Sequence, residues 1–391
     1  MRALVIGGGI AGCATAIALH RVGIEAVVYE AHAAVADDVG LFLTFAGNGM
    51  DALRVLGADE SVRAAAFPTP WMVMRSGTGR VLGRMASGSE GATSQTIKRT
   101  DLYRALRDEA ARRGIRIEYG KRLVAVEATT ARFADGSEAE ADLIVGADGL
   151  HSKVRTVIDP DAPQPRYVPV LNTGGYAAGV NIDAEPGTFT MVFGKRAFFG
   201  YTPAPNGEVW WFANPPFPTD PSDDDLARLN EGGAWRQRLL DLFADDRSPA
   251  LDLIRASTNP MTGWATYDLP VVPNWHRGRL VLVGDSAHAT SPSSGQGASM
   301  AIEDAVVLAK CLRDVAGVES AFAAYVGLRR PRVERVVAAG ARTSNLKVAG
   351  PIGRVIRDAM MPVFLRLASR AMDSAWMYRY HIDWDAPVGT R

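Results

Sequence analysis

Residues 2–30 read RALVIGGGIAGCATAIALHRVGIEAVVYE, and this stretch decides the fold. It begins with a short apolar run over residues 2–6 that ends at glycine, as a buried parallel strand does. The small, alanine-rich residues 11–22 predict a helix, and residues 25–29 predict a second strand. The chain therefore opens with a β-strand, an α-helix and another β-strand.

Three glycines with the spacing GxGxxG lie between the first strand and the helix. Gly7 permits a tight turn, Gly9 lets the backbone approach a pyrophosphate, and Gly12 allows the helix to pack closely on the strand. The helix start offers unpaired N–H groups to phosphates, and Glu30, at the end of the second strand, can accept hydrogen bonds from ribose hydroxyls. The pattern predicts a dinucleotide site, although alone it does not separate FAD from NAD. The residues predicted to contact the dinucleotide here are Gly7, Gly9, Ile10, Ala11, Gly12 and Glu30.

Composition narrows the class of protein. The 391 residues are enough for two or three domains, and 43 basic against 43 acidic residues give no net attraction to nucleic acid. Two cysteines form neither a CxxC pair nor a metal-ligand cluster, which favours a reducing cytoplasm and no metal. We expect no membrane span, because no apolar run reaches about 18 uninterrupted residues. The expected partner is a small molecule, and the expected state is a monomer or homodimer.

The composition and the hydrophobic pattern of the sequence change between residues 167 and 267. Short alternating runs with many aromatic residues and prolines predict a mostly antiparallel sheet with one covered face. A helical stretch over 223–243 interrupts it. Further helices are predicted over 99–113, 297–312, 319–339 and, with a kink at Pro362, 355–377.

Two later motifs complete the pattern. Residues 142–149 read DLIVGADG, and residues 284–288 read GDSAH, followed by Pro292 and the run Gly295 to Gly297. Together with the opening motif, and in this order, they resemble the FAD-dependent aromatic hydroxylase family, the group A flavoprotein monooxygenases typified by para-hydroxybenzoate hydroxylase. The family includes tetracycline-degrading monooxygenases and urate hydroxylases. The resemblance covers roughly residues 1 to 340.

The resemblance implies further cofactor contacts. Arg99 matches an arginine on the flavin side of the cofactor, and the backbone of Val124 matches a contact to adenine. Asp148 belongs to a motif that serves both FAD and NAD(P)H, and Asp285 matches an aspartate that binds the ribityl chain. A glycine loop that runs into a helix also aims N–H groups at the negative charge of reduced flavin. The implied contacts are Arg99, Val124, Asp148, Asp285, Pro292, Gly295, Gly297 and Ala298.

The expected fold class is α/β, with a Rossmann-like FAD-binding domain, a mostly antiparallel substrate domain and a C-terminal helix. The FAD-binding domain is expected to be discontinuous, over residues 1–67, 99–160 and 277–340. Residues 68–98 and 161–276 would form the substrate domain, and residues 341–391 a C-terminal helical segment.

The function implied by the resemblance is monooxygenation. NADH or NADPH would reduce non-covalently bound FAD, and O2 would form a flavin C4a-hydroperoxide that hydroxylates a small aromatic or polyketide-like substrate. Other oxygen insertions remain open, namely Baeyer–Villiger reaction, epoxidation and antibiotic inactivation. A non-catalytic protein that binds FAD or a ligand is a further alternative.

Single side chains are harder to interpret. The candidate substrate contacts are Tyr176, Phe193, Tyr201 and Trp211, although only one face of each strand can line a pocket. No catalytic acid or base is identified, and His288 is expected to hold its loop by hydrogen bonding. The basic residues from Arg329 to Arg335 are expected to form a solvated helix face.

Overall fold

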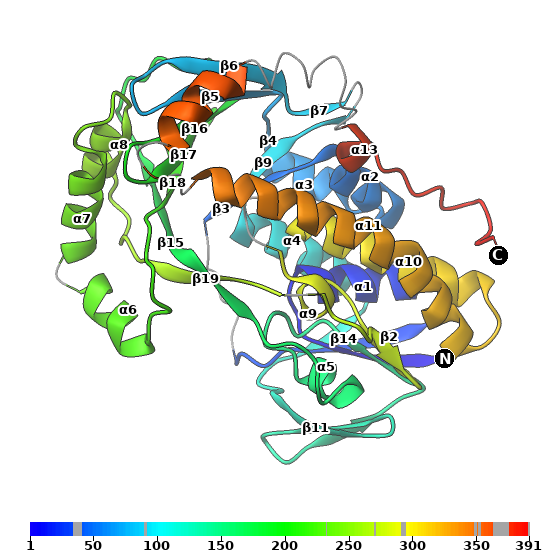
Figure 1. The fold of residues 1–391 in the computed structure, drawn as a ribbon. Helices are drawn as coiled ribbons and strands as arrows, with labels where there is room; N and C mark the ends of the chain where they lie inside the picture. Colours follow the sequence, from blue (N-terminus) through cyan, green and yellow to red (C-terminus); the bar gives the residue numbers. More distant parts are fainter. Residues whose placement is uncertain are drawn as a thin grey trace.

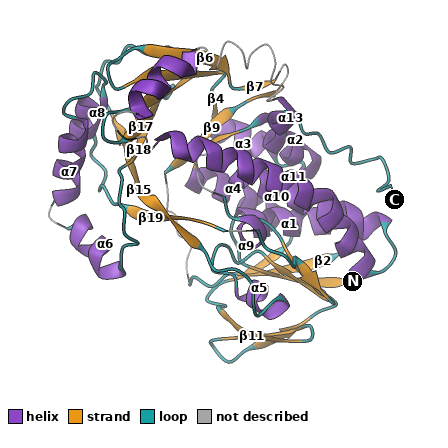
Figure 2. Ribbon diagram, viewed as in Figure 1, coloured by secondary structure: helices purple, strands orange, loops and turns teal. Residues whose placement is uncertain are grey.

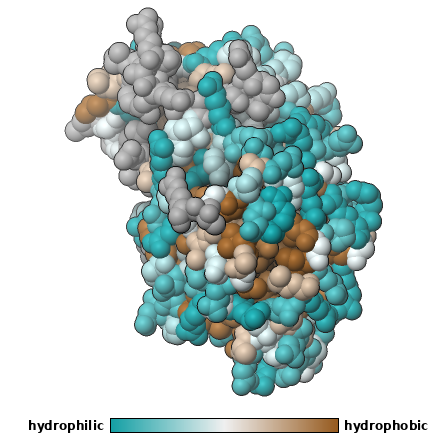
Figure 3. All heavy atoms as spheres, turned by 90° about the vertical axis from the view of Figure 1, so that its right-hand side faces the viewer, coloured by the Kyte–Doolittle hydropathy of each residue, from teal (hydrophilic) through white to brown (hydrophobic). Residues whose placement is uncertain are grey.

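We describe a computed structural model of the chain. It describes residues 1–33, 41–89, 92–231, 233–269, 271–290, 295–347, 350, 353–362 and 375–389. Within these ranges, no helix combines the length and apolar character needed to cross a membrane. The face that carries both chain ends is largely hydrophilic and has a hydrophobic patch near its centre (Figure 3).

A six-stranded sheet forms the centre of the first domain. Its strands, in spatial order, are β10 (Arg116–Glu118), β2 (Glu25–Tyr29), β1 (Arg2–Ile6), β14 (Leu143–Gly146), β21 (Leu280–Leu282) and β20 (His276–Arg277). All neighbouring strands are parallel except β20 and β21. The apolar runs are buried on both faces, as a parallel sheet covered by helices requires.

Three long helices cover this sheet in layers (Figures 1 and 2). Helices α1 (Ile10–Arg21) and α10 (Gly297–Asp314) lie side by side, and α11 (Val318–Lys347) runs along α10. Both α1 and α10 are buried along most of their length. This arrangement places the start of α10 beside the start of α1.

Glycines make the close approach of α1 to the sheet possible. Gly7 has a φ of 102°, and a Cβ atom there would lie 2.4 Å from the carbonyl oxygen of Ala147. A Cβ atom on Gly12 would lie 1.9 Å from the carbonyl oxygen of Gly7. The GxGxxG spacing therefore has a packing reason that is independent of any ligand.

A seven-stranded sheet forms the second domain, at the left of Figure 1. Its order is β19 (Trp264–Asp268), β15 (Arg166–Ala177), β18 (Val209–Asn214), β17 (Phe198–Pro203), β16 (Thr188–Phe193), β5 (Trp71–Ser76) and β6 (Val81–Ala86). Only β16 and β5 are parallel. The expected mostly antiparallel sheet is therefore confirmed. Helices α7 (Ala234–Phe243) and α8 (Ala250–Ala256) cover one of its faces, also as expected.

Smaller elements connect the two domains. A three-stranded sheet of β3 (Phe42–Phe45), β9 (Gln95–Lys98) and β4 (Phe67–Pro68) lies between them. The other elements are α2 (Gly47–Leu56), α3 (Asp59–Ala65), β7 (Gly88–Ser89), β8 (Ala92–Thr93), α4 (Arg99–Arg112), β11 (Leu123–Glu127), β12 (Thr130–Phe133), β13 (Glu138–Glu140), α5 (Lys153–Ile158), α6 (Asp223–Asn230), α9 (Asp285–His288) and α13 (Ala375–Tyr378).

Two expected helices differ from the structure. The stretch 223–243 forms two helices, α6 and α7, because Gly233 between them has a φ of 77°. The expected C-terminal helix is helical over 353–362 and in α13, and its residues 363–374 lie outside the described part of the chain. Residues 379–389 are not helical. Instead, the guanidinium groups of Arg21 and Arg313 lie 4.9 and 4.7 Å from the ring centre of Trp384, so this segment lies beside the last turns of α1 and α10.

Substitution of the two motif glycines by alanine is expected to separate packing from ligand binding. Gly12→Ala should lower the free energy of unfolding of the apoprotein by about 3 kcal/mol or more, because its new methyl group meets backbone. Gly9→Ala should cost about 1 kcal/mol or less, because no atom lies within 4 Å of a Cβ there. Urea unfolding of both apoproteins checks this, and equal stability of the two variants would contradict it.

Candidate active site

The three glycine-rich motifs meet at one edge of the six-stranded sheet. Gly7 follows β1, Asp148 follows β14, and Asp285 follows β21 by a few residues. Because these strands are parallel, their carboxyl ends share one edge, where open α/β sheets bind ligands. Segments nearly 280 residues apart in sequence are thus placed together.

Two helix starts converge at this edge. Helix α1 has Gly9 as its N-cap and α10 has Gln296, and neither residue makes a side-chain capping bond. Neither helix carries an acidic residue in its first turn. A Cβ atom on Gly284 would lie 2.8 Å from Ala11 and 3.3 Å from Ala301, so the loop after β21 fits between the two helices. The site therefore presents two positive helix ends to an anion.

The glycine loop has the space and polar groups that a dinucleotide needs. An added Cβ atom on Gly9 would meet nothing within 4 Å, so a pyrophosphate can approach the backbone there. The Glu30 carboxylate lies at the same loop and accepts hydrogen bonds from the backbone N–H groups of Gly8, at 2.8 Å, and His32, at 2.9 Å. These residues fit the pyrophosphate and ribose of FAD.

The two aspartates of the later motifs have different surroundings. Asp285 is exposed at the start of α9, and no other described residue gives its carboxylate a hydrogen bond or ion pair. Asp148 accepts hydrogen bonds from the Ser152 hydroxyl at 2.5 Å and from the backbone N–H of Lys153 at 2.7 Å. Burial raises the pKa of Asp148. Asp285 thus has the freer carboxylate, and Asp148 holds the start of α5.

The other cofactor candidates lie around the same edge or outside it. Arg99 begins α4, its side chain is exposed, and its backbone N–H donates to the Leu41 carbonyl at 2.8 Å. Val124 is 46% exposed on β11. Gly295, with a φ of 61°, and Ala298 flank the start of α10. Pro292 lies outside the described residues.

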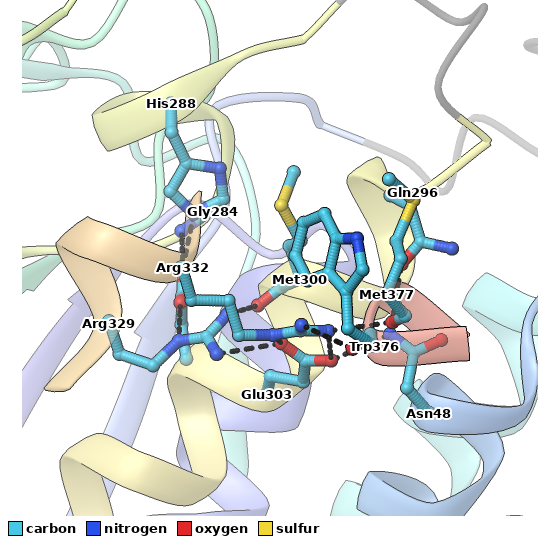
Figure 4. A network of polar contacts seen from close by, with 11 residues as sticks. Asn48, Gly284, His288, Gln296, Met300, Glu303, Arg329, Arg332, Trp376 and Met377 are labelled. Carbon is cyan, nitrogen blue, oxygen red and sulfur yellow. Dashed lines mark hydrogen bonds and ion pairs between the residues drawn. The ribbon is translucent and has the colours of Figure 1, made fainter. Parts of the chain in front are cut away.

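A buried ionic cluster joins α10 to α11 (Figure 4). The Arg329 guanidinium contacts Glu303 and Asp304, both at 2.7 Å, and the three side chains are fully buried. Arg332 contacts Glu303 at 2.8 Å, and its guanidinium also lies 3.9 Å from the ring centre of Tyr380. The expectation of a solvated basic face from Arg329 is therefore wrong for these two arginines, because adjacent acids on α10 pair with them.

The same cluster fixes the loops of the site. Asp304 accepts hydrogen bonds from the Gly284 N–H at 2.9 Å and contacts the His288 Nε2 atom at 2.5 Å. Glu303 accepts from the Asn48 amide at 2.6 Å, and Asn48 also donates to Gln296 at 2.9 Å (Figure 4). The loop after β21, the start of α2 and the N-cap of α10 are thus held by two adjacent acids. His288 has the expected hydrogen-bonding role.

Electrostatics keep Asp304 charged despite its burial. Desolvation alone would raise its pKa, but His288 and Arg329 outweigh this effect and lower the pKa to about 2. The group therefore stabilises the fold above its unfolded pKa, near 3.8, and this contribution is lost as the pH falls through about 2. The cluster persists across the neutral range.

The candidate substrate residues divide between the two faces of the seven-stranded sheet. Tyr201 and Trp211 are 2% and 0% exposed and pack against α7 and α8, so their rings are part of the hydrophobic core. We therefore withdraw these two as substrate contacts. Phe193 packs with Phe198 beneath the helix at 353–362. Tyr176 lies on the face toward β3 and β4 and contacts Trp210.

Glu303 and its contact with Asn48 are parts of the site that sequence reasoning missed. Their signals were present: an asparagine between two glycines, and two adjacent acids in an apolar helix. Neither signal names its partner, because Asn48 and Glu303 are separated by 255 residues.

Loss of one acid from the cluster is expected to destabilise the protein strongly. Glu303→Gln leaves Arg332 without its buried counter-charge and Arg329 with Asp304 alone, and should lower the free energy of unfolding by about 3 to 5 kcal/mol. Its control is Glu334→Gln, which removes the partially exposed pair with Arg330 and should cost about 0.5 kcal/mol or less. Denaturant unfolding measures both, and similar losses would refute the role of burial.

Comparisons with known proteins agree with this geometry. The family model described as "FAD binding domain" matches residues 1–340. A 3-amino-4-hydroxybenzoate 2-monooxygenase of Streptomyces platensis is 35% identical, over 100% of this chain and 98% of the relative. An FAD-dependent urate hydroxylase of Klebsiella pneumoniae is 31% identical, over 86% of this chain and 88% of its own length.

The fold has close structural neighbours. The crystal structure of Klebsiella pneumoniae HpxO complexed with FAD and uric acid superposes with a TM-score of 0.83 at 26% identity, and covers 97% of each chain. The family match over residues 1–340 and this structural similarity both place the three motifs in an FAD-binding fold. The chain belongs to the FAD-binding-domain family and is a flavoprotein monooxygenase.

Proposed function

We propose that this monooxygenase uses NADH or NADPH and O2 to hydroxylate a small, planar aromatic substrate. The observation that carries the proposal is the meeting of two uncapped helix starts beside the free carboxylate of Asp285. Two relatives are named for 3-amino-4-hydroxybenzoate and urate, which are small, planar and conjugated. They support the same substrate class for this chain.

The binding roles follow from the geometry of the site. FAD, when bound, supplies the electron transfer and the oxygen activation. The backbone at Gly9 would hold its pyrophosphate, Glu30 its adenosine ribose and Asp285 its ribityl hydroxyls. The start of α10, at Gly297, would place backbone N–H groups near the flavin ring, where they stabilise negative charge.

Exclusion of water is the second task of the chain. Phe42, Phe67, Tyr176 and Trp210 form an aromatic cluster between β3, β4 and the seven-stranded sheet. Such a cluster leaves few competing hydrogen-bond partners and favours a flat, apolar ring. We place the substrate along this aromatic cluster, because a water-excluding site limits side reactions of reactive oxygen.

Removal of the Asp285 carboxylate is expected to weaken FAD binding without harming the fold. Asp285→Ala loses a charge-assisted hydrogen bond worth about 1.5 to 3 kcal/mol, so the Kd for FAD should rise roughly 10- to 100-fold. The control Asp252→Ala removes an exposed aspartate on α8 in the other domain. Fluorescence titration with FAD measures both, and unchanged affinity in Asp285→Ala would exclude this contact.

The proposed reaction predicts the source of the inserted oxygen. Purified holoprotein should oxidise NADH or NADPH only in air, and faster when a planar aromatic substrate is added. With ¹⁸O2, mass spectrometry should find one labelled atom in the hydroxylated product. Nicotinamide oxidation that yields hydrogen peroxide alone, with every tested aromatic compound, would contradict hydroxylation.

A further inference from the structure

Lys98 lies at the seam between the two domains. It is the last residue of β9, and its register partner on β3 is Phe42. Its ammonium nitrogen lies 4.7 Å from the ring centre of Tyr176 on β15 and 5.3 Å from that of Trp210 on β18. One cation is thus held by aromatic side chains of the neighbouring seven-stranded sheet.

Lys98 has no ion pair with any described carboxylate. Glu208 is the acid whose charge interacts with Lys98, but it already accepts hydrogen bonds from Asn206 at 3.0 Å and Trp210 Nε1 at 3.1 Å. Asn206, then Trp210 and Lys98, lower the pKa of Glu208 against its burial. A half-buried ammonium that rests on aromatic faces and makes no ion pair with a described carboxylate is a cation still able to pair with an anion.

The surrounding rings hold a defined geometry. The ring centre of Trp210 lies 5.6 Å from that of Phe42. It lies 5.1 Å from the ring centre of Phe67 and 5.5 Å from that of Tyr176, and both of these contacts are edge-to-face. Burial, with Asp101 and Glu208, raises the pKa of Tyr176 to about 12, so its hydroxyl stays neutral and can donate a hydrogen bond. A flat ring fits such edge-to-face surroundings well.

This group of residues also adjoins Arg99, one of the proposed cofactor contacts. Lys98 precedes Arg99, whose backbone N–H binds the Leu41 carbonyl. A Cβ atom on Gly174 of β15 would lie 2.3 Å from the Leu41 side chain, so the loop before β3 touches the seven-stranded sheet. Lys98 is therefore positioned where a molecule between the two domains would meet it.

We propose that Lys98 recognises the anionic group of the substrate, and that the substrate is a planar aromatic acid. Its carboxylate pairs with the ammonium, and its ring packs against Tyr176 and Trp210. This inference rests on the proposed function and narrows its substrate class. An alternative role, a purely structural cation–aromatic contact, predicts no preference for acids.

The test uses the FAD-loaded protein and matched pairs of probes. Benzoate, 4-hydroxybenzoate and nicotinate are each compared with their neutral amides, and binding is followed by the change in flavin absorbance. At least one acid should bind 10-fold or more tightly than its amide. Lys98→Met should raise the Kd of that acid at least 10-fold and leave the Kd of the amide within twofold, whereas Lys98→Arg should retain most of the selectivity.

The control is Arg84→Met, which removes another cation–aromatic contact, between Arg84 and Trp71 on the outer strands β6 and β5. It should leave acid selectivity unchanged. Absence of binding by every acid, equal affinity for acids and amides, or equal selectivity in Lys98→Met would overturn the inference. If Lys98→Met does not fold, the ratio of the Kd values of amide and acid in the unmodified protein decides the test: a ratio of about 10 or more supports the inference, and a ratio near one overturns it. Aerobic NAD(P)H oxidation with neutral substrates, measured separately, shows whether the proposed function stands when this inference fails.

Discussion

The meeting of two helix starts at one edge of a parallel sheet is the constraint on which the rest of the structure depends. Helix α1 can approach the sheet only because Gly7 and Gly12 carry no side chain, and Gly284 lets the loop after β21 fit between α1 and α10. Their free N–H groups and positive ends then face the same space. An anion-rich cofactor is the ligand such a space favours, since no acid of either first turn competes for it.

A costly cluster maintains that geometry. Burying four charged side chains is expensive, and apolar residues of similar size would often give equal stability. Here Glu303 accepts a hydrogen bond from Asn48, and Asp304 accepts one from the backbone N–H of Gly284, so both acids hold loops of the site. Arg332 extends the cluster to the carbonyl oxygen of Met377 near the end of the chain. The cluster therefore links the cofactor loops to a segment that is distant in sequence.

Sequence predicted the elements whose signal is local. The first strand, the first helix and the second strand follow from glycine spacing and apolar runs, and the meeting of the motifs follows from the parallel strands. Alternation along β18 showed that its tryptophans face opposite sides, but it could not say which side is core. That choice depends on α7 and α8, which bury Trp211 and leave Trp210 at the seam. In the same way, the burial of Arg329 could not be predicted without its partners on α10, Glu303 and Asp304.

The most direct measurement of the central claim is an equilibrium titration of the purified apoprotein with FAD, followed by flavin absorbance and fluorescence. If the two helix starts form the cofactor site, the protein takes up one FAD per chain, turns yellow and keeps the flavin through gel filtration. A protein that stays colourless and leaves the flavin spectrum unchanged, while folded, would contradict the account.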